Sequence, residues 1–419
     1  MTVFSYSAII VTLAAAMSYL NHRFIKMEST IAMMGSALVI SLIMLVAAHS
    51  GFPVVQDQLQ HFVKELHFRD LVMNVMLGVL LFAGALSIDI SSLKQQLIEI
   101  GALVFVSTIA SAFLNGFLLY FILHLFGAGV DFVYCMLFGC LISPTDPIAV
   151  LAIFSQLGAP KKLETIVLSE SLFNDGVGVV LFLTTSSVAF GGVPAAWYSV
   201  IELFLREAVG GVVFGCIIGW VVYKLLKGIS DGKVEILLTI ATVFGGYTLA
   251  QNLEVSGPLA MVATGIFLGN YRDKTGFSLK DRVELHSFWE LADDLFNIIV
   301  FLILGLEILE VPFNGAIITV AIIMVPIVLL VRYLTVALPM GMLIPWRKPI
   351  PYTITILSWG GLRGGLAVAL ALSIPAGPVR DLILPLTYVV VLFAILVQGT
   401  TIKHFVHRAN KHVAKRKKV

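Results

Sequence analysis

The chain has 419 residues, of which 59% are hydrophobic and only 12% are charged, and its mean hydropathy is +0.99. Because a water-soluble domain carries about 25% charged residues, this composition excludes a soluble globular protein. The net charge of +2 gives no reason to expect a nucleic-acid partner, and the 3 cysteines lie in apolar segments, where they indicate neither disulfides nor a metal site.

Apolar segments of about twenty residues, the length that crosses a bilayer, recur along the whole chain. We therefore predict an all-α polytopic membrane protein with 13 transmembrane helices. The first span is expected to be retained, because no basic region precedes it and no small-residue cleavage site follows it. In chain order the predicted spans cover residues 2–20, 30–48, 70–88, 99–125, 132–157, 163–189, 200–226, 234–252, 255–270, 285–309, 315–344, 352–374 and 382–406.

The distribution of basic residues predicts the orientation of these spans. An odd number of spans places the termini on opposite sides of the membrane. Taken alternately, the connections and the tail, counted with the span ends that adjoin them, divide 24 of the 27 lysines and arginines 21 to 3, and the richer set is expected in the cytoplasm. The prediction is a protein of the cell (inner) membrane with its N-terminus outside and its C-terminus inside. The basic tail, residues 408–419, is expected to fix this orientation or to contact anionic membrane lipids.

Two spans carry residues that interrupt a helix. The fifth contains the run C-L-I-S-P-T-D-P-I-A-V, in which Pro144 and Pro147 each remove a backbone donor and clash with the preceding turn. The twelfth contains S-W-G-G-L-R-G-G-L-A, in which two glycine pairs flank Leu362 and Arg363. Interrupted helices at corresponding places in two halves of a transporter are typical of an ion site at the membrane midplane. Spans 4–6 and 11–13 then form two inverted sets of three.

The sixth span contains S-E-S-L-F-N-D-G, although each ionisable group at the bilayer centre costs about 2.5–3.5 kcal/mol. Ser171 and Asp175 are four residues apart and share a helix face, where a hydroxyl and a carboxylate suit a small cation. A carboxylate in a partly wet cavity of low dielectric binds a proton or a metal cation, but not both. Competition of this kind, in a site that opens alternately to each side of the membrane, is sufficient for antiport.

Other charged groups lie within predicted spans. On the neighbouring face of the sixth span, Glu170 is expected to pair with Arg363, and Asn174 to hydrogen-bond Asp146 of the fifth span. Arg332 is a further basic residue within a span, and the sequence assigns it no role. The tenth span contains W-E-L-A-D-D-L-F-N, which indicates either a cation-attracting funnel at the cytoplasmic side or a solvated helix start, formed by Glu290, Asp293 and Asp294.

Together, S-P-T-D-P, E-S-L-F-N-D-G and G-G-L-R-G-G resemble the motifs of NhaP-type monovalent cation/proton antiporters, of the CPA1 family in the sodium/hydrogen exchanger superfamily. The resemblance covers essentially all the spans. It implies a fold like that of NhaA, with inverted repeats and two interrupted helices that cross, and it implies a homodimer. It also implies that a core, residues 99–190 and 313–407, moves against a dimerisation part, residues 1–98 and 191–312.

The same resemblance implies the roles of the ion-binding residues. Asp175 corresponds to the carboxylate that binds the cation or the proton. Ser171 and Thr145 correspond to further Na+ ligands, Thr145 mainly through its backbone carbonyl. An Asn-Asp pair in the sixth span implies electroneutral exchange of one Na+, Li+ or K+ for one proton. No cofactor is implied beyond the transported ions.

Supporting roles follow from the resemblance in the same way. Asn174 and Asp146 correspond to a pair that braces the crossing, and Glu170 and Arg363 to a structural ion pair. One position departs from the family pattern, because the third span has L-L-F-A-G-A-L with Ala83 where many members carry an acidic residue. This departure removes one candidate cation ligand.

Two other classes of function fit the sequence less well. Sodium-coupled symport of an organic solute on a related fold would need more aromatic and amide groups near the crossing. An intramembrane aspartyl protease would use Asp146 and Asp175, but such proteases resemble Tyr-Asp and Gly-x-Gly-Asp patterns, and neither surrounds these residues. We therefore predict a transporter and not an enzyme.

Overall fold

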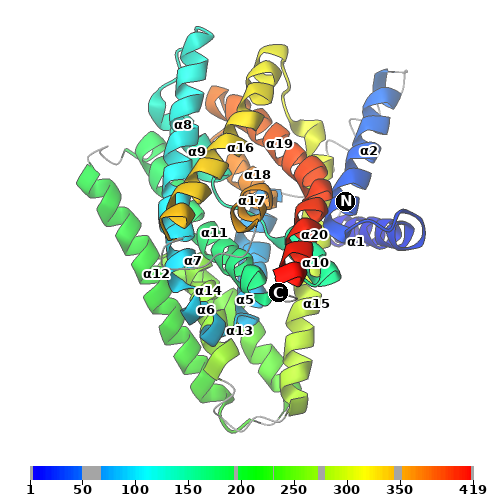
Figure 1. Cartoon of the computed structure of the whole chain (residues 1–419), viewed down its shortest axis with the longest axis vertical. Coiled ribbons are helices and arrows are strands. Elements are labelled where there is room, and N and C mark those ends of the chain that lie inside the picture. The colour runs from blue at the N-terminus through cyan, green and yellow to red at the C-terminus, as the bar shows by residue number, and fades with distance from the viewer. Residues whose placement is uncertain are drawn as a thin grey trace.

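The computed structural model describes residues 3–49, 68–192, 197–229, 231–271, 279–343 and 352–416. Every regular element in these residues is a helix, and the only β-type pairing among them is an isolated antiparallel bridge between Asp146 and Leu362. Figure 1 shows a bundle of long, tilted helices that cross one another at different angles. The all-α architecture predicted from the sequence is confirmed.

The helices follow the predicted spans, and several of them contain a short π-helical segment or a 3-10 turn. In chain order they are α1 (Val3–Leu20), η1 (Asn21–Ile25), α2 (Ser29–His49), α4 (Phe68–Leu71), η2 (Val72–Met76), α5 (Leu77–Leu86), α6 (Ile90–Gln95), α7 (Leu97–Gly101), η3 (Ala102–Ser107), α8 (Thr108–Leu125), α9 (Phe132–Ile142), α10 (Ile148–Leu157), α11 (Lys161–Phe190), α12 (Trp197–Leu226), α13 (Gly232–Asn252), α14 (Gly257–Tyr271), α15 (Leu279–Leu306), η5 (Glu307–Glu310), α16 (Gly315–Leu343), α17 (Thr353–Trp359), α18 (Gly365–Ser373), α19 (Pro378–Phe393), η6 (Ala394–Gln398) and α20 (Gly399–Arg416).

Apolar side chains cover the outside of the bundle as well as its interior. Within the described residues, 8 helices are long and apolar enough to cross a membrane. On their outward faces, Leu237 of α13 is 65% exposed and Ile322 of α16 is 61% exposed. Large apolar faces of this kind are unfavourable in water and favourable against lipid chains. The chain is therefore a multi-pass membrane protein.

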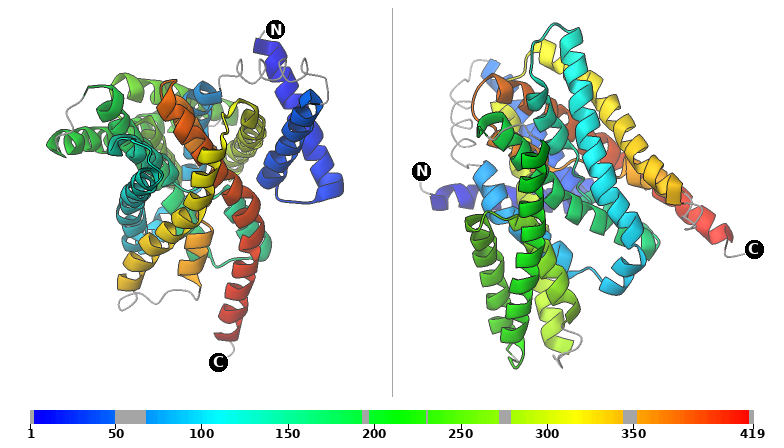
Figure 2. Two further views of the ribbon diagram at one scale, coloured as in Figure 1. Left: turned by 90° about the horizontal axis from the view of Figure 1, so that it is seen from above. Right: turned by 90° about the vertical axis from the view of Figure 1, so that its left-hand side faces the viewer.

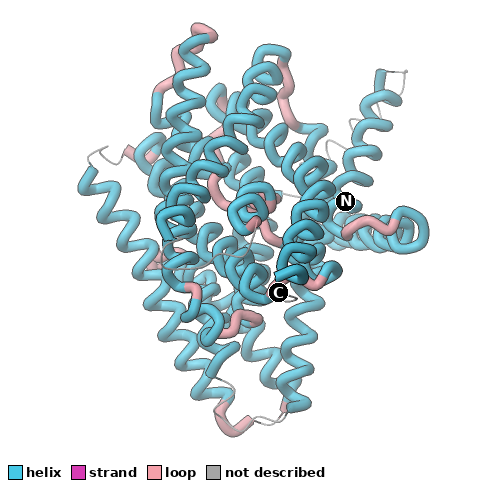
Figure 3. Tube along the Cα trace, viewed as in Figure 1, coloured by secondary structure: helices cyan, strands magenta, loops and turns pink. Residues whose placement is uncertain are grey.

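Both predicted interruptions are confirmed. Between α9 and α10 the helix is broken from Ser143 to Pro147, and between α17 and α18 it is broken from Gly360 to Gly364. Figure 3 shows non-helical segments in the interior of the bundle. Broken backbone at this depth is tolerated where protein or a wet cavity satisfies its polar groups. The partners of these groups therefore define the candidate site.

Glycines allow several helices to approach closely. A Cβ added to Gly139 of α9 would lie 2.0 Å from the carbonyl oxygen of Ala112 in α8. A Cβ on Gly269 of α14 would lie 2.4 Å from the carbonyl oxygen of Leu86 in α5. Small residues at helix contacts are typical of membrane bundles, in which close packing replaces the hydrophobic effect.

Figure 2 shows α1 and α2 on one side of the molecule and α12 on the opposite side.

The last helix extends beyond the predicted span. α20 continues to Arg416, and it buries Val406 and Ala409 while it exposes Lys403 and Arg408. The described part of the basic tail is therefore helical. Residues 417–419 lie outside the described residues, as do the connections that carry Arg272, Lys274, Arg347 and Lys348.

Candidate ion-binding site

The two interruptions are joined to each other by a backbone hydrogen bond. The N–H of Asp146, in the break between α9 and α10, donates to the carbonyl oxygen of Leu362, in the break between α17 and α18, over 2.9 Å. The two residues form an antiparallel bridge. The first break leaves the Asp146 N–H without a helical acceptor, and the second leaves the Leu362 carbonyl without a helical donor. The hydrogen bond between them satisfies both groups. The two broken helices meet at this point.

Arg363 supplies donors to carbonyl groups of the first break. Its Nη1 donates to the carbonyl oxygens of Ser143 and Pro144, over 3.1 and 3.0 Å. In an unbroken helix the Ser143 carbonyl would accept from residue 147, but Pro147 has no N–H. The buried guanidinium, 2% exposed, thus replaces the backbone donor that Pro147 lacks, and it also supplies a donor to the Pro144 carbonyl, because the Ile148 N–H bonds the Asp146 side chain. This explains why an arginine lies between two glycine pairs in the middle of a span.

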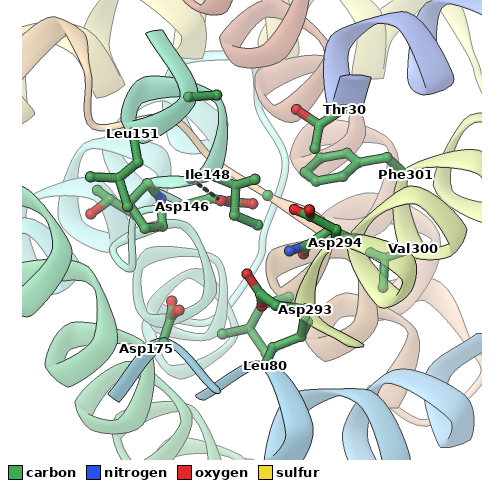
Figure 4. A pocket seen from close by; sticks show the side chains of 18 of the residues that line it. Thr30, Leu80, Asp146, Ile148, Leu151, Asp175, Asp293, Asp294, Val300 and Phe301 are labelled. Carbon is green, nitrogen blue, oxygen red and sulfur yellow. Dashed lines mark hydrogen bonds between the residues drawn. The ribbon is translucent and has the colours of Figure 1, made fainter. Parts of the chain in front are cut away.

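Asp146 organises the start of α10. Its Oδ1 accepts a hydrogen bond of 3.0 Å from the N–H of Ile148, the first residue of α10. Its other carboxylate oxygen lies against Gly364, where an added Cβ would come within 2.0 Å of Oδ2. A glycine is therefore required at position 364 for the carboxylate to occupy this place. Figure 4 shows the Asp146 side chain at the edge of a cavity, with its bond to Ile148 dashed.

Two side chains of α11 hold Thr145. The Asn174 amide accepts from the Thr145 N–H over 3.2 Å and donates to Thr145 Oγ1 over 2.9 Å. The Ser171 hydroxyl donates to the Thr145 carbonyl oxygen. Because α9 ends before Thr145, these bonds replace helical partners that its backbone has lost. The predicted hydrogen bond from Asn174 to Asp146 is therefore wrong, because the partner of Asn174 is the neighbouring residue Thr145. Ser171 and the Thr145 carbonyl lie together as expected.

Glu170 pairs with a different arginine from the predicted one. Its Oε1 lies 2.6 Å from Nη2 of Arg332 in α16, and each side chain is only 3% exposed. Arg332 Nη2 also donates to the Leu357 carbonyl over 3.1 Å, in the last turn of α17. The predicted Glu170–Arg363 pair is wrong because the donors of Arg363 are directed to the broken backbone. The signal for Arg332 was its position inside an apolar span, where a charge requires a partner.

A cavity of about 510 Å³ opens beside the crossing. Carboxylates from four parts of the chain line it, and within the described residues no lysine, arginine or histidine does. Figure 4 shows Asp175, Asp146 and Asp293 around this space. Confined charges of one sign raise the local concentration of ions of the other sign. The cavity is therefore suited to cations, and its acidic residues are Glu28, Asp146, Asp175, Glu290, Asp293 and Asp294.

Asp175 is a carboxyl group with no ionic partner among the described residues. It lines the cavity from α11 and is half-buried. Among the described residues no side chain forms an ion pair with it and none donates a hydrogen bond to it. These residues also contain no group of three or more histidine, cysteine, aspartate or glutamate side chains able to hold a metal ion. One carboxylate with nearby hydroxyl and carbonyl oxygens suits a monovalent cation or a proton.

The acidic residues of the tenth predicted span belong to the same cavity. Glu290, Asp293 and Asp294 of α15 line it together with Asp175. Their charges therefore act on the space that Asp175 lines, while Glu290 and Asp294 are also exposed. α5 adds no carboxylate to the lining; Gly84 takes part, while Ala83 is 5% exposed and does not.

Glu28 is an acidic residue of the cavity that sequence reasoning missed. It precedes α2 and accepts hydrogen bonds from the N–H groups of Thr30, over 3.1 Å, and Ile31, over 3.0 Å. A carboxylate at this place satisfies the free donors at a helix start. The local signal was an acidic residue just before an apolar run. Its proximity to Asp146 and Asp293 depends on the tertiary packing of α2 against α15.

Comparisons with known proteins show the family of the chain. Residues 7–408 match the family described as sodium/hydrogen exchanger, transmembrane. The Na(+)/H(+) antiporter NhaP of Pseudomonas aeruginosa is 44% identical over 406 residues, which cover 96% of this chain and 96% of that protein. The Na(+)/H(+) antiporter NhaH of Halobacillus dabanensis is 33% identical over 381 residues, which cover 89% of this chain and 91% of that protein.

A solved structure has a similar fold. It is the sodium proton antiporter MjNhaP1 from Methanocaldococcus jannaschii at pH 8, which aligns with a TM-score of 0.75. The alignment covers 97% of this chain and 98% of that chain, at 18% sequence identity. At this level of identity the likeness establishes the shared fold.

Proposed function

Because the chain belongs to the sodium/hydrogen exchanger family, we propose that it is an antiporter that exchanges Na+ for H+ across a membrane. The family predicted from the three motifs is confirmed, and it is a family of transporters and not of enzymes. The observation that carries the proposal is Asp175, whose carboxylate has no ionic partner among the described residues and lines a cavity surrounded by acidic groups. Such a group needs a cation or a proton to neutralise it.

Exchange follows from competition for this carboxylate. Na+ binds Asp175 together with the Ser171 hydroxyl and the Thr145 carbonyl, two oxygens already in contact with each other. A proton on Asp175 removes the negative charge and releases the cation. Since one carboxylate takes up either one Na+ or one proton, the exchange is one for one and electroneutral. The carboxylates of α15 attract the cation without holding it in the site.

The arrangement of the chain in the membrane is part of the proposal. We assign 13 spans with inverted repeats, the N-terminus outside and the C-terminus in the cytoplasm, on the division of basic residues 21 to 3. Residues 99–190 and 313–407 form the moving core, since they contain both broken helices and the bridge between them. Residues 1–98 and 191–312 form the dimerisation part of a homodimer.

Proton movement in sealed vesicles tests this function. Purified protein is reconstituted with a pH-sensitive dye inside, and Na+, Li+ or K+ is added outside with and without an imposed voltage. Na+ should drive proton efflux at a rate that the voltage does not change. If no cation moves protons, antiport is wrong. A rate that depends on voltage, or a potential generated by the flux, would overturn the one-for-one stoichiometry while leaving antiport in place.

A further inference from the structure

A second cavity, of about 600 Å³, lies at the junction of α1, η1 and α2. Figure 2 shows this junction at the edge of the molecule. In contrast to the acidic cavity beside the crossing, it contains basic groups, and within the described residues no carboxylate lines it. Its polar lining consists of Ser18, Asn21, His22, Arg23, Lys26 and Ser29.

Hydrogen bonds fix the turn that carries these groups. The Asn21 side chain donates to the Met27 carbonyl over 3.0 Å and accepts from the Met27 N–H over 3.1 Å. The Lys26 N–H donates to the Asn21 carbonyl over 2.7 Å, and Lys26 has a left-handed backbone conformation with φ of 57°. The turn is therefore closed on itself, and it presents Arg23 and Lys26 in a fixed arrangement.

Within the described ranges, Arg23 and Lys26 have no acidic partner. Both side chains are exposed, and among the described residues no carboxylate lies within 4.0 Å of either one. A guanidinium, an ammonium group and serine hydroxyls in one concave site match the oxygens of a phosphate group. Basic pockets between transmembrane helices are suited to the headgroups of anionic lipids.

The basic cavity adjoins the acidic one. Met27 and Ser29 line both cavities, and Glu28 between them lines the acidic cavity. Two positive charges at this border oppose the approach of a cation to the acidic cavity. A bound anion would remove that opposition. The border is therefore a place where an anion changes cation access without touching Asp175.

We propose that the cavity at the α1–α2 junction binds the phosphate of an anionic phospholipid headgroup. The bound phosphate neutralises Arg23 and Lys26 and thereby favours cation entry into the adjoining acidic cavity. The lipid is chosen over free phosphate because the cavity lies at the ends of two apolar helices, where headgroups are concentrated. The effect on cation entry rests on the proposed antiport, whereas the binding of lipid does not.

Native mass spectrometry tests the binding directly. Purified protein is mixed with phosphatidylglycerol or phosphatidylcholine, and retained lipid is counted for the wild type, R23Q/K26Q and the charge-matched control K227Q/K233Q. The exposed residues of this control lie just after α12 and at the start of α13, outside the basic cavity and the tail. The wild type and the control should retain phosphatidylglycerol in preference to phosphatidylcholine, and R23Q/K26Q should lose this preference. Equal retention of phosphatidylglycerol by R23Q/K26Q and the wild type would overturn the site.

Transport in vesicles tests the effect on cations. Replacing about one quarter of the phosphatidylcholine by phosphatidylglycerol should lower the Na+ concentration for half-maximal exchange in the wild type and in K227Q/K233Q. This fall should be about twofold larger than the fall in R23Q/K26Q. The K227Q/K233Q control corrects for the loss of two positive charges from the protein surface near a charged vesicle. An identical response of R23Q/K26Q and the wild type would overturn the effect on entry. If inorganic phosphate on phosphatidylcholine vesicles reproduced the response, the site would be one for free phosphate and the lipid assignment would be wrong. If the wild type exchanged no cation at all, antiport would fail, and the lipid count would still decide the binding.

Discussion

The Glu170 carboxylate and the Arg332 guanidinium lie 2.6 Å apart, with 3% of each side chain exposed. The pair joins α11, which carries Asp175, to α16, and Arg332 extends the connection to the Leu357 carbonyl of α17. A Cβ on Gly361 would lie 2.6 Å from Arg332 Nε, so the second break also makes room for this side chain. The ion pair thus holds the ion-binding helix against the helix that is broken at the crossing.

Arg332→Gln should destabilise the protein strongly, because it leaves Glu170 as a buried charge without its cation. The expected loss is about 3–5 kcal/mol, seen as a large fall in the thermal unfolding midpoint of the purified protein. Arg206→Gln is the control, since Arg206 pairs with Glu254 at an exposed site where an ion pair contributes about 0–1 kcal/mol. Equal midpoints for the two variants would contradict the structural role of Arg332.

Asp175→Asn should fold normally and exchange no ions. The amide has nearly the same shape, but it can neither bind a proton at this site nor neutralise Na+. Na+-driven proton movement in vesicles should be lost, while the thermal unfolding midpoint stays close to that of the wild type. Asp89→Asn is the control, because Asp89 caps α6 outside the cavity and its exchange should remain normal. An Asp175→Asn protein that still transports Na+ would refute the central role of this carboxylate.

Asn174→Ala should weaken both the fold and the ion site. The Thr145 N–H and hydroxyl would lose their partners, at a cost of about 1–3 kcal/mol for a buried group left unsatisfied. Half-maximal exchange should also require more Na+, since Thr145, whose carbonyl is a proposed Na+ ligand, would then be held from α11 by Ser171 alone. Ser169→Ala is the matched control on the same helix, because the buried Ser169 hydroxyl has no hydrogen-bond partner in the part of the chain that the structure describes. If both variants behaved alike, Asn174 would have no bracing role.

Gly364→Ala should prevent the crossing from forming correctly. Its Cβ would meet the Asp146 carboxylate at 2.0 Å, so that either the carboxylate or the bridge to Leu362 must move. We expect low yield, or purified protein with a lowered unfolding midpoint and no exchange. Gly245→Ala in α13 is the control, since a Cβ there meets no atom within 4 Å and alanine favours a helix. A fully active Gly364→Ala protein would show that the close contact is not required.

Neutralising the funnel should reduce cation affinity and leave the maximal rate unchanged. In D293N/D294N the Na+ concentration for half-maximal exchange should rise about threefold at low ionic strength. The difference from the wild type should shrink when choline chloride is added, because salt screens charges that act through the cavity. Exchange measured over a range of Na+ concentrations, at two ionic strengths, separates the change in cation affinity from any change in maximal rate. A change in maximal rate alone, with no change in the Na+ concentration for half-maximal exchange, would place the two aspartates in the turnover of the transporter and contradict a role in attracting the cation.

Much of the site could be predicted from local chemistry. Pro144 and Pro147 lack backbone donors, so the break in the fifth span follows from the sequence, and helical periodicity places Ser171 and Asp175 on one face. The partners of buried charges could not be predicted in this way. Several carboxylates and arginines lie in spans, and the choice of Arg332 for Glu170 depends on the packing of α16 against the core. The shift from Asp146 to Thr145 as partner of Asn174 depends on the path of a non-helical segment, which no periodicity describes.

The bond from Arg363 to the Ser143 carbonyl joins residues 220 positions apart in the chain. During synthesis the fifth span therefore reaches the membrane long before its missing donor has been made. Until then the Ser143 carbonyl must accept its hydrogen bond from water, from lipid headgroups or from the insertion machinery. A fragment that ended after α11 would remain in this incomplete state, so the first half of the protein cannot mature by itself. Assembly of the crossing is thus delayed until the ribosome has synthesised Arg363.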